Sequence, residues 1–184
     1  MNKRIMNKKF SNGLLDSMVK CALSSLNSTF THVASLVRGN SLFSMGTNGL
    51  HSSCSRNCNG RSTRCSFHAE ANAIRKLASH KGTKNNKSFE LVVIRVSSTG
   101  VIGNSKPCFQ CIQQIMKSRF NISKVYYSNA EGDIICESIN KLLQSDTIHI
   151  SHGLRQKLGY CPSEIPLIMM LQNKQLSKFL ITKY

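Results

Sequence analysis

The chain has 184 residues, and 40% of them are hydrophobic, which predicts one domain with a well-buried core. No apolar run approaches the ~20 residues that a membrane-spanning helix needs, and the basic N-terminus lacks the apolar stretch of a secretory signal, so we expect an intracellular, cytoplasmic protein that is neither secreted nor membrane-bound. A net charge of +17, from 25 Lys and Arg against 8 Asp and Glu, either attracts nucleotides and nucleic acids or marks a generally basic, solvated surface.

The first part of the chain predicts a basic arm, a helix and a hairpin. Residues 1–13 are basic and have no apolar pattern, so we expect a poorly ordered arm. Apolar residues recur at helical spacing over 13–26 and predict a helix with one buried face. Two short apolar stretches, 32–37 and 42–46, flank turn residues and predict a β-hairpin.

A helix, a strand and a second helix follow. Residues 68–80 predict a helix, with Ser66 as a candidate N-cap. Residues 89–96 are almost continuously apolar, which is typical of a central strand. Pro107 suits the first turn of the second helix, where its missing N–H costs little. The intervening residues 97–106 either lengthen the strand into a ribbon or form a flap.

The C-terminal part predicts an antiparallel pair of strands. Residues 124–128 and 133–137 have strand composition, and the short turn between them can join only antiparallel neighbours. His149 and His152 fit an alternating strand, with metal binding as the alternative. Residues 161–184 predict a basic helical extension packed on the domain.

Two short motifs carry the chemistry, H-A-E at 68–70 and P-C-F-Q-C at 107–111. Their imidazole and two thiols supply three ligands, whereas a structural zinc site normally has four. The open position suits water, whose pKa a bound zinc lowers to about 7, and Glu70 is close enough to move protons. The alternatives are a purely structural metal site and a C-x-x-C redox pair. Because no export signal precedes them, the 8 cysteines favour metal-binding thiols in a reducing compartment over disulfides.

Over roughly residues 30–145, the chain resembles the cytidine and deoxycytidylate deaminase superfamily, whose signature is H-x-E followed by P-C-x-x-C. The resemblance implies a three-layer α-β-α fold with a mixed central sheet of about five strands, in a domain that we place at 14–160. It also implies a homo-oligomer. The functional residues that it implies are the zinc ligands His68, Cys108 and Cys111, the general acid and base Glu70, and the substrate contacts Asn48 and Ala69.

The resemblance implies a zinc-dependent hydrolase that converts the cytosine moiety of cytidine, deoxycytidine or their monophosphates to uracil and releases ammonia. In this hypothesis Glu70 takes a proton from the attacking water and delivers protons to N3 and to the departing ammonia. One alternative, favoured by the net charge, is a deaminase of RNA or single-stranded DNA. The other is a non-catalytic deaminase-fold protein for binding or assembly.

The loop over 47–67 is rich in candidate ligands and arginines. Deoxycytidylate deaminases resemble the chain here and sometimes hold a second, structural zinc, which would pin a loop of low apolar content. Free thiols are the alternative, because C-x3-C-x6-C is not a strong zinc-ribbon spacing. The arginines either contact a substrate phosphate or form a solvated face. The candidate ligands are His51, Cys54, Cys58 and Cys65, and the arginines are Arg56, Arg61 and Arg64.

The two halves of the chain point to different substrates within the family. The loop before the H-A-E motif resembles that of the deoxycytidylate deaminases, which act on a nucleotide. The antiparallel pair at 124–137 resembles that of the cytidine deaminases that act on free nucleosides, whereas the other branches place a helix between these two strands. The phosphate state of the substrate therefore stays open at this point.

Overall fold

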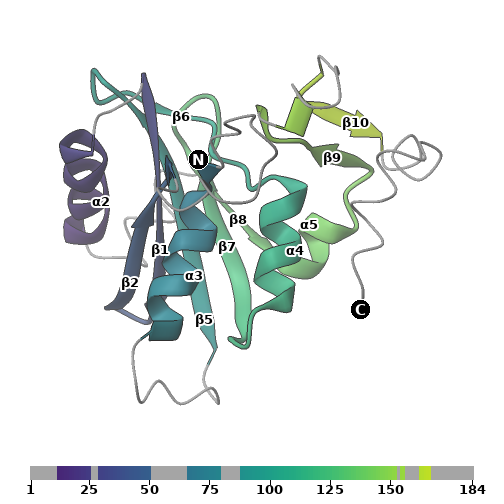
Figure 1. The fold of residues 1–184 in the computed structure, drawn as a ribbon, viewed down its shortest axis with the longest axis horizontal. Helices are drawn as coiled ribbons and strands as arrows, with labels where there is room; N and C mark the ends of the chain where they lie inside the picture. The colour runs from purple at the N-terminus through teal and green to yellow at the C-terminus, as the bar shows by residue number, and fades with distance from the viewer. Residues whose placement is uncertain are drawn as a thin grey trace, which may run out of the picture.

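The computed structural model describes residues 12–25, 29–50, 66–79, 88–152, 154–155 and 162–166. Its sheet is built from β1 (Phe30–Arg38), β2 (Ser41–Thr47), β5 (Phe89–Ser97), β6 (Ile102–Gly103), β7 (Ile122–Ser128) and β8 (Ile134–Ser138). The strand order is β2-β1-β5-β7-β8, with β6 attached to β5 (Figure 1). β5 and β7 are parallel, and the other neighbouring pairs are antiparallel. The expected mixed sheet and the expected antiparallel pair, β7 and β8, are both confirmed.

Helices cover both faces of this sheet, so the predicted three-layer α-β-α fold is confirmed (Figure 1). α2 (Asn12–Ser24) packs on one face, where Met18 and Ala22 join a core cluster with Val33 and Val92. α3 (Ala69–Ser79), α4 (Phe109–Lys117) and α5 (Ile139–Leu143) lie on the other face. Among the described residues, no helix is both long and apolar enough to cross a membrane.

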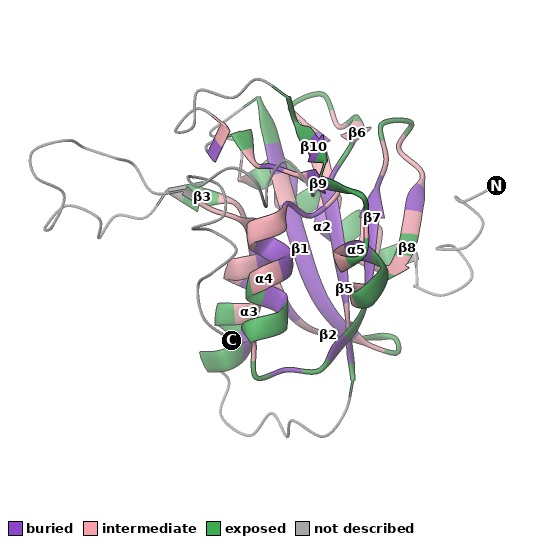
Figure 2. Cartoon of the chain, turned by 90° about the vertical axis from the view of Figure 1, so that its right-hand side faces the viewer, coloured by how far each residue is buried: buried purple, intermediate pink, exposed green. Residues whose placement is uncertain are grey.

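Alternation along the central strands sends side chains into both layers. In β5, Leu91 and Val93 join the cluster beneath α3 and α4, whereas Val92 and Ile94 join the cluster beneath α2. Both faces of β5 are therefore buried (Figure 2), which explains why its sequence is almost continuously apolar.

Two of the helices, α3 and α4, begin at the same end of the sheet. β5 and β7 are parallel, so the chain must cross over between them, and α4 forms that crossover. β2, β5 and β7 finish and β1 begins at one end, which we call the carboxyl end. α4 starts where the chain leaves this end, and α3 starts there too, because Ala69 in its first turn lies against Gly46 near the end of β2.

Residues 97–106 form a ribbon, which decides between the two predicted alternatives. The chain turns at Gly100, whose φ of 82° favours glycine, and β6 returns along β5. The buried hydroxyl of Ser105 then donates to the Val93 carbonyl at 2.8 Å, and its N–H donates to the Ser128 carbonyl at 2.8 Å. These bonds fix the residues before α4 against β5 and β7.

The predicted positions of Ser66 and Pro107 at the two helix starts are wrong, because each lies outside its helix. Ser66 is not an N-cap, because it lies in β4 (Ser66–Phe67), which pairs with β3 (Gly49–Leu50) before α3 begins. Pro107 lies outside α4 rather than in its first turn. The N-cap is Cys108, whose extended backbone (φ −74°, ψ 162°) ends the stretch that Ser105 holds against the sheet.

The C-terminal part differs from its prediction as well. His149 ends a strand, β9 (Thr147–His149), but His152 lies beyond that strand and is exposed. Within the expected helical extension, β10 (Glu164–Pro166) is a strand paired with β9, because Ile165 is buried opposite Ile148. Residues 167–184 lie outside the described residues. At the other terminus, α2 begins two residues inside the expected arm, and residues 1–11 are likewise not described.

Candidate metal centre

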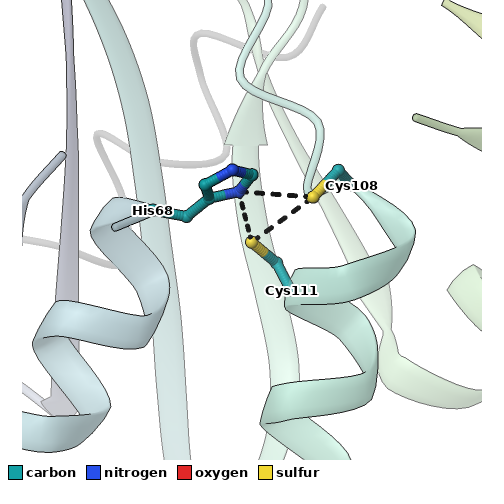
Figure 3. A group of neighbouring side chains, drawn as sticks. All are labelled: His68, Cys108 and Cys111. Carbon is teal, nitrogen blue, oxygen red and sulfur yellow. Dashed lines mark hydrogen bonds between the residues drawn. The ribbon is translucent and has the colours of Figure 1, made fainter. Parts of the chain in front are cut away.

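His68, Cys108 and Cys111 meet at the carboxyl end of the sheet (Figure 3). The Nδ1 atom of His68 lies 3.0 Å from the sulfur of Cys111 and 3.3 Å from that of Cys108, and the two sulfurs are 3.5 Å apart. Tetrahedral zinc with ordinary Zn–N and Zn–S bonds needs edges of about 3.5–3.8 Å, which this triangle approaches to within about 0.5 Å. The donor set of one imidazole and two thiols also suits zinc, so the residues present fit that ion.

Two helix N-termini carry the three side chains. His68 directly precedes α3, Cys108 is the N-cap of α4, and Cys111 follows one turn along the same helix. The positive end of the α4 dipole stabilises negative charge on sulfur at these positions. The two motifs, far apart in sequence, therefore meet because both helices begin at the same end of the sheet.

A close approach of β2 to α3 sets the position of His68. A Cβ atom on Gly46 would lie 2.5 Å from the backbone nitrogen of Ala73 and 2.9 Å from the carbonyl oxygen of Ala69, so the contact requires glycine. The side-chain amide of Asn72 donates to the Thr47 carbonyl at 3.0 Å and ties the first turns of α3 to the end of β2.

Hydrogen bonds among the three candidate ligands shift their pKa values. The hydrogen bond between the two sulfurs lowers the pKa of Cys108 and raises the pKa of Cys111. The hydrogen bond with Cys108 raises the pKa of His68 to about 9. A divalent cation would displace the remaining protons, because zinc binds thiolate and neutral imidazole.

Glu70 lies directly beside the three ligands. It occupies the first turn of α3, is 5% exposed, and lies close enough to Cys111 and Cys108 that these residues influence its pKa. Burial raises the pKa of Glu70 above its ordinary value, and the charge of Cys108 adds to this effect. A carboxyl group with a raised pKa can both take up and release protons, which is what a general acid and base must do.

The expected substrate contacts lie at the same end. The Oδ1 atom of Asn48 accepts the backbone N–H of His32 at 2.8 Å, and the Asn48 N–H donates to the His32 carbonyl at 3.1 Å. Ala69 is fully buried at the start of α3. Contact of Asn48 or Ala69 with a substrate stays a prediction. The loop candidates outside the described residues are His51, Cys54, Cys58, Cys65, Arg56, Arg61 and Arg64.

Sequence patterns did not single out His32 and Arg95, which also lie here. They face each other across β1 and β5. Burial lowers the pKa of His32 to about 4, and the charges of Arg95 and His68 add to the shift, so the three groups are close together. The alternation of side chains along a strand could have located them. His32 is two residues from the core residue Ala34 and Arg95 is two residues from Val93, so both face α3 and α4.

Residues 9–129 match the family model described as the cytidine and deoxycytidylate deaminase zinc-binding region. The match covers more than half of the chain and includes the three candidate ligands and Glu70. A comparison with curated proteins finds no match.

Among solved structures, the chain is similar to the dCMP deaminase from the cyanophage S-TIM5 in complex with dCMP and dUMP, with 24% identity over 65% of this chain and 83% of that chain and a TM-score of 0.42. It is also similar to the cytidine deaminase from Burkholderia pseudomallei, with 19% identity over 71% of this chain and 94% of that chain and a TM-score of 0.47. The cytidine deaminase from Mycobacterium leprae is 18% identical over 71% of this chain and 98% of that chain, with a TM-score of 0.43. At these identities and scores, the similarities carry no argument about the substrate.

Proposed function

Because the chain belongs to the cytidine and deoxycytidylate deaminase family through its zinc-binding region, we propose that it is a zinc-dependent hydrolase that converts a cytosine moiety to uracil and releases ammonia. His68, Cys108 and Cys111 would hold the zinc, and Glu70 would move the protons. The observation that supports this most directly is a buried carboxyl group, that of Glu70, beside the three candidate ligands. Within the described residues, no fourth ligating side chain joins the three, which leaves room for water.

Zinc, when bound, supplies Lewis-acid chemistry by lowering the pKa of a coordinated water to about 7. Glu70 accepts a proton from the attacking water at a carboxylate oxygen and delivers it to N3 of the ring. It then carries the second proton of that water to the amino group on C4, which departs as ammonia. Burial of Glu70 in the first turn of α3 keeps its carboxyl group fixed for both transfers.

The test replaces Glu70 by Gln in the zinc-loaded protein. We expect zinc content to stay unchanged and ammonia release from cytosine nucleosides or nucleotides to fall by about 10²- to 10⁴-fold, the usual contribution of a general acid and base. Glu137→Gln is the matched control. Glu137 lies on β8, where it accepts a hydrogen bond from Tyr127 and forms an ion pair with Lys141, and it is not one of the candidate ligands. Full activity in the Glu70 variant would contradict the mechanism, and bound zinc without any activity in the wild type would favour a non-catalytic module.

Two further expectations belong to the same proposal. Zinc analysis of the wild type also tests the second metal site predicted in residues 51–65: one zinc per chain leaves those thiols free, and two support the structural site. Family membership supports a homo-oligomer, which light scattering of the zinc-loaded protein tests. A monomeric mass would contradict it.

A further inference from the structure

A row of polar side chains crosses the carboxyl end of the sheet next to the metal centre. Asn48 follows β2, His32 lies on β1, and Arg95 lies opposite His32 on β5. His32 and Arg95 continue the alternation of residues that face α3 and α4, so they share the face that carries His68. Neighbouring strands are about 4.8 Å apart, so Arg95 lies one strand farther from Asn48 than His32 does.

Arg95 is held in place without an acidic partner. Its guanidinium carbon lies 3.9 Å from the centre of the Phe30 ring. Among the residues that the structure describes, Arg95 makes no ion pair with a carboxylate, and its Nε atom is buried without a hydrogen-bond partner. Buried polar groups are normally satisfied, and a guanidinium presents five N–H donors in a planar fork that matches carboxylate and phosphate.

Further positive groups surround the same end. Burial lowers the pKa of His149. The nearby Cys108 and Glu164 oppose this shift, whereas Lys106 and Arg155 add to it. Lys106 pairs with Glu164 at 3.6 Å, in an ion pair whose glutamate is exposed. Counted together with Arg95, three cationic side chains (Arg95, Lys106 and Arg155) stand against two carboxyl groups (Glu70 and Glu164) at this end, and an excess of this sign attracts an anion.

We propose that Arg95 binds a phosphate group carried by the substrate, so that the enzyme acts on a cytosine nucleotide in preference to the free nucleoside. This inference rests on the proposed function and adds the chemical class of the substrate to it. The phosphate of a nucleotide lies across the sugar from the base, and Arg95 ends the row of polar side chains that begins at Asn48, the expected substrate contact. A free nucleotide and a nucleic-acid strand supply the same phosphate chemistry, and the experiment separates them.

The first measurement compares kcat/KM of zinc-loaded protein for deoxycytidine, its 5′-monophosphate, and a short single-stranded oligonucleotide with one dC. We expect Arg95→Gln to lower kcat/KM for the phosphate-bearing substrates by roughly tenfold to hundredfold, mainly through KM, because charged hydrogen bonds of this kind are lost. Deoxycytidine should change by less than about twofold. A merely structural role for Arg95 would reduce all three substrates alike.

Arg119→Gln is the matched control. Arg119 also lies over a phenylalanine ring, that of Phe120, but it donates to the carbonyl of Ala78 in the last turn of α3, far along the sheet from His68. We expect this variant to leave all three substrates unchanged.

The second measurement does not depend on turnover. Zinc-loaded Glu70→Gln is titrated with deoxyuridine and with deoxyuridine monophosphate in a calorimeter, with and without Arg95→Gln. Tighter binding of the monophosphate, lost in the double variant, supports the inference. Equal binding of the two ligands overturns it.

The outcomes separate the two proposals. Absence of ammonia release from every substrate defeats the proposed function, while the calorimetric result still decides the role of Arg95. Equal turnover of nucleoside and monophosphate leaves the deaminase intact and defeats the phosphate inference. Preference for the monophosphate assigns the phosphate to a free nucleotide. Preference for the oligonucleotide, weakened by added salt, assigns it to a nucleic-acid strand.

Discussion

Two arginines lie over phenylalanine rings at opposite ends of the β1–β5 ladder, and the two pairs differ in how deeply the ring is buried. At the carboxyl end, Arg95 of β5 covers Phe30 of β1 at 3.9 Å. At the other end, which we call the aromatic end, Arg38 of β1 covers Phe89 of β5 at 4.1 Å. The two contacts have similar geometry, but Phe89 is fully buried and Phe30 is 41% exposed.

The aromatic end is a closed core. The Phe89 ring meets Phe43 and Phe120 edge to face, with centroids 5.3 and 5.8 Å apart. Such contacts add to the free energy gained by burying the rings. At the carboxyl end, by contrast, the Phe30 ring contacts the guanidinium of Arg95, and His32 lies two residues farther along β1. Burial of Phe89 at the aromatic end therefore supports the fold, whereas the polar side chains at the carboxyl end are available for chemistry.

Truncation of the two rings should change the stability of the fold by very different amounts. We expect Phe89→Ala to lower the free energy of unfolding by about 3–5 kcal/mol, the cost of removing a buried aromatic ring and leaving a cavity. Phe30→Ala should cost about 1 kcal/mol or less, because its ring is already partly in water. Urea unfolding at constant zinc measures both values. Equal losses would contradict the division of roles between the two ends.

A methyl group at Gly46 should damage both stability and the metal centre. The added Cβ would meet the backbone of Ala73 at 2.5 Å, which must push α3 away from β2 and move His68 and Glu70 with it. We expect Gly46→Ala to cost about 1–3 kcal/mol, as overpacking does, and to weaken zinc binding. Gly49→Ala is the matched control, since a Cβ atom added there would have no atom within 4 Å. Zinc affinity measured against a competing chelator should separate the two variants.

Much of this arrangement was predictable from the sequence. Apolar runs located β1, β2, β5, β7 and β8, and the offsets of the two metal motifs located the candidate centre. Local patterns could not show that β1 lies beside β5, and the pairing of His32 with Arg95 depends on that neighbour relation and its register. The β9–β10 pair was missed for the same reason, because its strands are short and separated in sequence. The second zinc site stays a prediction.

The carboxyl end should also make the fold sensitive to acid. The pKa of His32 is about 4 in the folded chain, against 6.5 as its ordinary value, so the unfolded chain takes up a proton first as the pH falls. The stability contributed by neutral His32 is therefore complete above pH 6.5 and is lost progressively as the pH falls towards 4. We expect the free energy of unfolding to fall by about 2 kcal/mol more in the wild type than in His32→Gln over this range. The exposed His152→Gln variant should behave as the wild type does.

Removal of the Glu164 carboxylate should have the smallest effect on stability and a defined effect on binding. Its ion pair with Lys106 is 3.6 Å long and the glutamate is exposed, so Glu164→Gln should change the free energy of unfolding by less than about 1 kcal/mol. The change also removes negative charge near His149, so deoxyuridine monophosphate should bind about two- to fivefold more tightly at low salt, and added salt should erase the gain. Calorimetry on the zinc-loaded Glu70→Gln background measures this, with Asp16→Asn on α2 as the control. Unchanged affinity at low salt would show that the charge around Lys106 does not reach the ligand.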